Sequence, residues 1–125
     1  MDKLETDFTE LEKQFPSASM DRRADGSALI TIRDFPLKTG WNTDRATILF
    51  VVPVGYPLAR PDTFWADEGL RLSHGGMPAN SGLNANYGAG PQRLWFSFHP
   101  GAWNPNRDNL VTYARLIRRR LEEAR

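Results

Sequence analysis

The sequence contains no cysteine and only two histidines, His74 and His99. Without cysteine the chain cannot form a disulfide framework, a cysteine-ligated zinc or iron–sulfur site, or a thiol nucleophile. The two histidines match neither the His-x-His nor the His-Glu-x-x-His spacing, so the sequence predicts no metal site. The glycines at 75–76 and 88–90 do not lead from a strand into a helix, so we expect no phosphate-binding loop and no cofactor.

The chain also has little excess of either charge, with 16 Lys and Arg against 15 Asp and Glu. A dedicated nucleic-acid-binding protein shows a strong basic excess, so this near balance argues against that class. No apolar run approaches the roughly 20 residues that a membrane-spanning helix needs. Residues 1–7 lack the apolar core of a signal peptide. We therefore expect a cytoplasmic protein without nucleic-acid or membrane partners, forming a single domain over residues 1–125.

The N-terminal segment has the pattern of an amphipathic helix, because its apolar residues fall on one face and acidic residues on the others. These apolar residues are spaced four, three and four apart, at Leu4, Phe8, Leu11 and Phe15. Pro16 disfavours helical geometry in the residue before it. The sequence therefore predicts a helix over residues 2–14.

Four strands are expected to follow, over residues 18–23, 28–32, 46–52 and 62–66. The Asp25-Gly26 pair between the first two strands is a hairpin-turn signal, and the next two runs are rich in β-branched and other apolar residues. Residues 80–92 are mainly glycine, asparagine, alanine and proline, and they predict a long loop of the kind that is usually functional or mobile.

The C-terminal part contains one alternating segment and one helix. Residues 93–99 alternate, so an extended backbone places Trp95, Ser97 and His99 on one face, opposite Leu94, Phe96 and Phe98. A helix then begins near Asp108 or Asn109, either of which can cap it. Its apolar stripe comprises Leu110, Tyr113, either Leu116 or Ile117, and Leu121. Because helices flank a run of strands, the sequence predicts an α+β fold with an antiparallel sheet.

Ser97 is the best candidate nucleophile in the sequence. A serine is inert unless a base lies within hydrogen-bonding distance, and His99 is two positions further along the chain. The alternative is that Ser97 is an ordinary strand residue, which the residues alone favour. No Gly-x-Ser-x-Gly motif surrounds it, which argues against a hydrolase of that type.

Proline and tryptophan motifs are the most distinctive feature of the chain. A Tyr-Pro-x-x-x-Pro motif occupies residues 56–61, after the strand predicted over 46–52, and a Trp-x-Pro motif at 103–105 precedes the last helix. In their order and spacing these motifs resemble those of the ubiquitin-conjugating enzyme (UBC-like) superfamily. Within it the chain most resembles the divergent bacterial branch called prokaryotic family E.

The resemblance implies a UBC-like fold with an N-terminal helix, a four-stranded antiparallel meander, a long active-site loop and a C-terminal helix. It also implies a role in a bacterial ubiquitin-like protein conjugation pathway. The implied partners are a ubiquitin-like protein, an activating-type adenylating enzyme and a deubiquitinase-like metalloprotease. In the family the first helix contacts the activating enzyme, so Glu5, Glu12 and Lys13 form a candidate docking surface; the alternative is simple solvation.

The catalytic region departs from the family pattern, in which a His-Pro-Asn motif shortly precedes a catalytic cysteine. Two alignments are open. In the first, residues 74–76 (His-Gly-Gly) take the place of His-Pro-Asn, and the cysteine position falls within residues 95–97. In the second, residues 99–101 (His-Pro-Gly) take that place and the cysteine region is deleted. Thioester chemistry is excluded by either alignment.

Two classes of function follow from this resemblance. In the first, Ser97 accepts the C-terminus of the ubiquitin-like protein as an oxyester, with His99 as the base. Four further residues are expected to shape this site: His74, Asn80, Trp95 and Trp103. In the second, the chain is a cysteine-less variant that binds a ubiquitin-like protein or its activating enzyme as a scaffold. A weaker third possibility is an unrelated α+β binding module.

Overall fold

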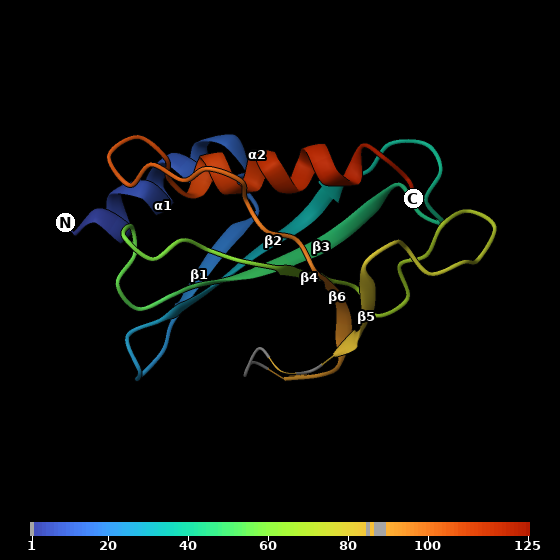
Figure 1. The fold of residues 1–125 in the computed structure, drawn as a ribbon, viewed down its shortest axis with the longest axis horizontal. Helices are drawn as coiled ribbons and strands as arrows, with labels where there is room; N and C mark the ends of the chain where they lie inside the picture. The colour runs from blue at the N-terminus through green and yellow to red at the C-terminus, as the bar shows by residue number, and fades with distance from the viewer. Residues whose placement is uncertain (1, 85, 87–89) are drawn as a thin grey trace.

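The computed structural model describes residues 2–84, 86 and 90–125, and it contains two helices and one sheet (Figure 1). In chain order the elements are α1 (Lys3–Gln14), β1 (Ala18–Arg22), β2 (Ala28–Pro36), β3 (Arg45–Val52), β4 (Phe64–Ala66), β5 (Ser81–Asn84), β6 (Arg93–Phe96) and α2 (Leu110–Leu121). The two helices lie side by side against one face of the sheet (Figure 1).

The sheet has the strand order β1-β2-β3-β4-β6-β5, and every neighbouring pair is antiparallel. Its first four strands form the predicted meander, so the α+β expectation is confirmed. Beyond the meander, β6 pairs with β4 and carries β5 at the sheet edge. The two additional strands place the segment that follows β6 next to the segment that precedes β5.

The long loop predicted over residues 80–92 is wrong in part, because residues 81–84 form β5, and its positions 85 and 87–89 lie outside the described residues. This strand has no alternation of apolar and polar side chains, and Leu83, its one large apolar residue, is exposed. Its pairing is therefore supplied by main-chain hydrogen bonds to β6, with the Ser81–Phe96 pair at one end and the Asn84–Arg93 pair at the other. Tertiary pairing here outweighs a composition that disfavours strands.

Strand β2 is longer than predicted and continues to Pro36. Its pairing with β3 shifts in register between Ile32 and Phe35. Within this irregularity, Asp34 has a φ of 55°. A bulge of this kind interrupts the alternation of buried and exposed side chains without ending the strand. The sequence pattern of β2 therefore stops at Ile32, although the strand itself continues.

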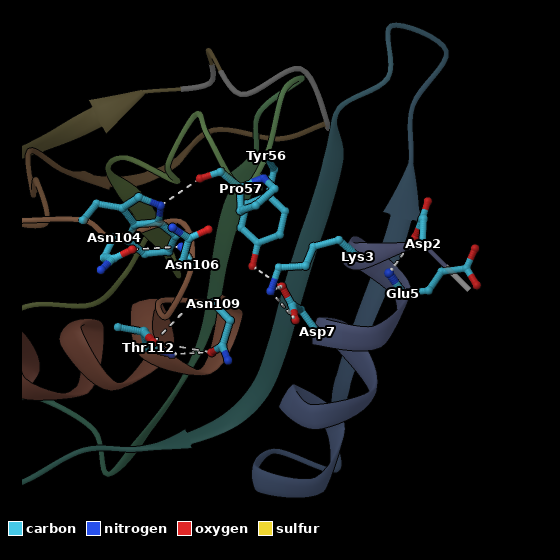
Figure 2. Close-up of polar contacts among 11 residues, drawn as sticks. Asp2, Lys3, Glu5, Asp7, Tyr56, Pro57, Asn104, Asn106, Asn109 and Thr112 are labelled. Atoms are coloured by element: carbon cyan, nitrogen blue, oxygen red, sulfur yellow. Dashed lines mark hydrogen bonds and ion pairs between the residues drawn. The ribbon is translucent and has the colours of Figure 1, made fainter.

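Both predicted helices are confirmed, and Asn109 is the cap of α2. The Asp2 side chain accepts a hydrogen bond from the Glu5 N–H at 2.8 Å at the start of α1. Asn109 and Thr112 form a reciprocal capping box at the start of α2 (Figure 2). On α2 the buried stripe contains Ile117, whereas Leu116 is only half-buried. No helix among the residues described is long and apolar enough to cross a membrane.

The main core lies between the sheet and the two helices. Fully buried aromatic side chains fill its centre, among them Phe50, Phe64, Phe96 and Tyr113. The opposite face of the sheet carries a smaller cluster, in which Trp95 packs against buried Leu29, Leu49 and Trp65.

Gly40 provides a test of packing between the β2–β3 connection and the C-terminal segment. Its φ is +110°, and an added Cβ would lie 2.5 Å from the Cβ of Ala124. We expect Gly40→Ala to lower the free energy of unfolding by more than about 1 kcal/mol, because both the backbone conformation and the contact are unfavourable. Urea denaturation measures this change.

The matched control is Gly69→Ala, because a Cβ at Gly69 meets nothing within 4 Å. Equal urea midpoints for the two variants would contradict the expected crowding at Gly40.

Candidate active site

A cavity of about 330 Å³ lies between the segment after β6, the residue before β5 and the C-terminal half of α2. Three of the residues predicted for the site line it: Asn80, Ser97 and His99. The structure therefore brings together both predicted catalytic residues and one of the four residues expected to shape the site.

Backbone pairing explains why Asn80 and Ser97 meet. Ser97 directly follows β6 and Asn80 directly precedes β5, so they extend the β5–β6 ladder by one step. The Ser97 N–H donates to the Asn80 carbonyl oxygen at 2.8 Å. Asn80 has a φ of 56°, in the left-handed region that asparagine tolerates better than most residues, and this turns the chain into the strand.

His99 is paired with a residue that the sequence analysis did not select. Its Nδ1 lies 2.6 Å from Oδ1 of Asp62, which precedes β4. The two residues are 37 positions apart, and no sequence motif links them. Only the β4–β6 pairing brings them together, which is why sequence reasoning missed Asp62.

Ser97 and His99 line the same cavity but are not directly bonded to each other. Within the described part of the chain, no hydrogen bond joins their side chains, and β6 ends at Phe96, before either residue. Catalytic hydrogen bonds are often long in a ligand-free site and shorten only with substrate bound. The roles assigned to the two residues therefore stay predictions.

The wall of the cavity formed by α2 and the residues after it is rich in arginine, with Arg119, Arg120 and Arg125 among the lining residues. Arg120 is buried, and its guanidinium donates to the carbonyl oxygens of Ala79, Glu123 and Arg125 at 3.0–3.1 Å. Burial lowers the pKa of Arg120 from its usual value, and the neighbouring charge of Arg125 acts in the same direction. Through the bond to Ala79, Arg120 ties α2 to the segment that carries Asn80.

The other three predicted site residues lie elsewhere. His74 is exposed, and its Nδ1 accepts a hydrogen bond from the Gly76 N–H at 3.2 Å. Trp95 packs on the face of the sheet opposite the helices. Trp103 donates from Nε1 to the Pro57 carbonyl oxygen at 2.9 Å, which fastens the Trp-x-Pro motif to the Tyr-Pro motif. None of these three side chains lines the cavity.

The Tyr-Pro motif has a structural role that the sequence did not reveal. The Tyr56 hydroxyl donates to Oδ2 of Asp7 at 2.6 Å, and Lys3 Nζ lies 3.0 Å from the same oxygen (Figure 2). Burial, together with the hydrogen bond and charge of Asp7, raises the pKa of Tyr56. The motif thus anchors α1 through a buried carboxylate.

The predicted docking surface on α1 is solvent-accessible. Glu5 lies 3.3 Å from an Arg22 nitrogen, and Lys13 lies 3.0 Å from Glu10. Glu12 is exposed. Exposed ion pairs of this type contribute little stability, so a partner can replace them at small cost.

Among the described residues, no three histidine, aspartate or glutamate side chains lie close enough together to hold a metal ion.

Comparison with protein families gives one match. The model of the family described as prokaryotic E2 family E matches residues 5–124, almost the whole chain. The comparisons with curated proteins and with solved structures find no match.

Proposed function

The chain belongs to prokaryotic E2 family E, and from this membership we propose that it carries the C-terminus of a ubiquitin-like protein as an oxyester on Ser97. The family itself indicates a role in bacterial ubiquitin-like conjugation. The observation that carries the finer proposal is that Ser97, Asn80 and His99 line one cavity. A hydroxyl nucleophile fits a chain that has no thiol to offer.

The reaction proposed for Ser97 is acyl transfer from an activated C-terminus. An activating-type adenylating enzyme supplies the ubiquitin-like protein as an acyl adenylate. The Ser97 Oγ attacks the acyl carbon and forms the ester bond, while the bond from that carbon to the adenylate phosphate breaks and AMP leaves. The Oγ proton passes to His99. An amine acceptor then displaces Ser97 and receives the acyl group.

An oxyester reacts with amines more slowly than a thioester does, so this chemistry depends on accurate positioning. The cavity offers donors for that purpose. Asn80 lies beside Ser97, and Arg119 brings positive charge to the same wall. Developing negative charge on an acyl oxygen is stabilised by preorganised donors of this type.

The proposal includes three partners. The ubiquitin-like protein and the activating enzyme follow from the family, and we place the activating enzyme on the α1 surface around Glu5, Glu12 and Lys13. A deubiquitinase-like metalloprotease completes the set, because conjugates have to be hydrolysed to return the ubiquitin-like protein.

A second function is favoured by one observation, the absence of a hydrogen bond between Ser97 and His99 in the residues described. In that case the chain binds the ubiquitin-like protein or the activating enzyme without carrying an acyl group. Both functions use the same partners, so a charging experiment separates them.

The test mixes the protein with the ubiquitin-like protein, the adenylating enzyme and ATP, and maps covalent adducts by mass spectrometry. We expect an adduct on Ser97 that hydroxylamine removes and that Ser97→Ala abolishes. Ser19→Ala is the matched control, because Ser19 is exposed on β1, which β2 and β3 separate from β4 in the sheet. A stable complex without any adduct would support the binding function and contradict the oxyester.

A further inference from the structure

The contact between Asp62 and His99 has the geometry of a positioned imidazole. Its N···O distance of 2.6 Å is short for a nitrogen donor, as expected when the acceptor is a carboxylate. A carboxylate at neutral pH only accepts hydrogen bonds, so Nδ1 of His99 must carry a proton. In a neutral imidazole the other nitrogen, Nε2, is then an acceptor.

We propose that Asp62 is a positioning residue that holds His99 with its proton on Nδ1, so that Nε2 is the proton acceptor of the cavity beside Ser97. The use of this acceptor in acyl transfer rests on the proposed function. The assignment of the tautomer does not, because it follows from the Asp62–His99 geometry alone.

The main chain around Asp62 is held by two further contacts. The Thr63 N–H donates to the Phe98 carbonyl oxygen at 2.8 Å, which sets Asp62 beside His99 across the two segments. The Thr63 carbonyl oxygen accepts from the hydroxyl of fully buried Tyr113 at 2.7 Å. The main chain next to Asp62 is therefore tied to β6's continuation and to the core through Thr63.

Both side chains of the pair are exposed, Asp62 by 47% and His99 by 58%. An exposed contact with a carboxylate, even when both groups are charged, contributes little to the free energy of unfolding. The contact is short and its main chain is well supported, yet it adds little stability. We therefore infer that its effect is to orient the His99 ring. It also means that Asp62 can be replaced without unfolding the protein.

The acyl-transfer step uses the assigned tautomer directly. As Ser97 Oγ bonds to the acyl carbon and AMP departs, the Oγ proton moves to Nε2. His99 is then a cation, and the Asp62 carboxylate at Nδ1 stabilises it. A solvent base removes the Nε2 proton afterwards and restores the neutral ring.

His74 serves as an internal reference for this assignment. Its Nδ1 accepts a hydrogen bond from the Gly76 N–H, so its proton lies on Nε2. The two histidines of the chain should therefore hold opposite tautomers, and one spectrum reports both.

The test is nitrogen-15 NMR of the histidine-labelled full chain at a pH where both rings are neutral. We expect the Nδ1–H form for His99 and the Nε2–H form for His74. Asp62→Ala should convert His99 to a mixture of both tautomers and leave His74 unchanged, and Asp62→Glu should restore Nδ1–H in part. An Nε2–H form of His99 in the wild type, or no change in Asp62→Ala, overturns the proposal.

A second measurement compares charging rates. Asp62→Ala should slow formation of the Ser97 ester by roughly tenfold or more, a part of the effect of a general base, and Asp62→Glu should recover part of that rate. An unchanged rate in Asp62→Ala overturns the positioning role. A wild-type protein that never charges contradicts the proposed function instead, and the tautomer spectrum then decides the inference about Asp62.

Discussion

Replacing Phe96 with alanine is expected to lower the free energy of unfolding by about 3–5 kcal/mol, the range for a large aromatic side chain in a core. Phe96 is 1% exposed and stacks on Phe64 with ring centroids 4.6 Å apart. Trp41 also contacts Phe96, in an edge arrangement with ring centroids 6.4 Å apart. Because these large neighbours are themselves packed in the core, they cannot fill the void that the truncation leaves, which places the variant toward the upper part of the range.

Phe96 also supports the candidate site, because Ser97 follows it and the Arg120 guanidinium lies 5.3 Å above its ring. The residues that line the candidate-site cavity should therefore be less well ordered in the variant, even under conditions in which the variant is folded. Chemical denaturation gives the change in stability, and hydrogen exchange at the Ser97 amide reports the local effect.

Leu58→Ala is the control for this comparison, because Leu58 is 82% exposed and its truncation should change stability by less than about 0.5 kcal/mol. A Phe96→Ala variant within 1 kcal/mol of that control would contradict the described core.

Replacing Tyr56 with phenylalanine should lower the free energy of unfolding by about 1.5–3 kcal/mol at neutral pH, because it removes a hydrogen bond to a buried carboxylate. Asp7 is 4% exposed and keeps only Lys3 as a partner in the variant, among the contacts described for it. The cost is larger than that of an ordinary neutral hydrogen bond, since the acceptor is charged.

The same pair predicts a pH dependence with a defined sign. The folded protein raises the pKa of Tyr56, so its stabilisation is complete below the ordinary tyrosine pKa of about 10 and is lost as pH rises. Above that pH the unfolded chain ionises Tyr56 and the folded chain does not. Each further pH unit then reduces the difference in free energy of unfolding between the wild type and Tyr56→Phe by up to about 1.4 kcal/mol.

Urea titrations of wild type and Tyr56→Phe at pH 7 and near pH 11 measure this effect. The stability difference should shrink at the higher pH, while changes from all other groups are common to both proteins. A difference that stays constant between the two pH values would show that the Tyr56–Asp7 contact is not formed in solution.

The periodic elements of this fold are predictable from the sequence because each encodes its own pattern. The stripe through Leu4, Phe8 and Leu11 predicts α1, and the apolar run over 46–52 predicts β3. The α+β class and the family resemblance follow from the order of these elements and of the Tyr-Pro and Trp-x-Pro motifs.

The remaining features depend on contacts between distant parts of the chain. Strand β5 has no pattern of its own and exists through its pairing with β6. Asp62 meets His99 across 37 positions, which no local motif encodes. Trp95 and Trp103 show the opposite limitation. Alternation would place Trp95 on the same face as Ser97, but β6 ends at Phe96 and the alternation does not continue to the site. Trp103 lies outside the strands, and its side chain is held by the Pro57 carbonyl oxygen.

The base of the β5–β6 hairpin, where the Ser97 amide bonds to Asn80, has a consequence for how the chain can vary. The ladder runs from the Ser81–Phe96 pair to the Asn84–Arg93 pair, and so separates the cavity from the connection at the far end by about 10 Å of paired strand. Insertions between residues 84 and 93 would lengthen the far end and leave the cavity in place. This connection is therefore a natural position for an epitope tag or a fluorophore, and a place where relatives can diverge in length without moving their chemistry.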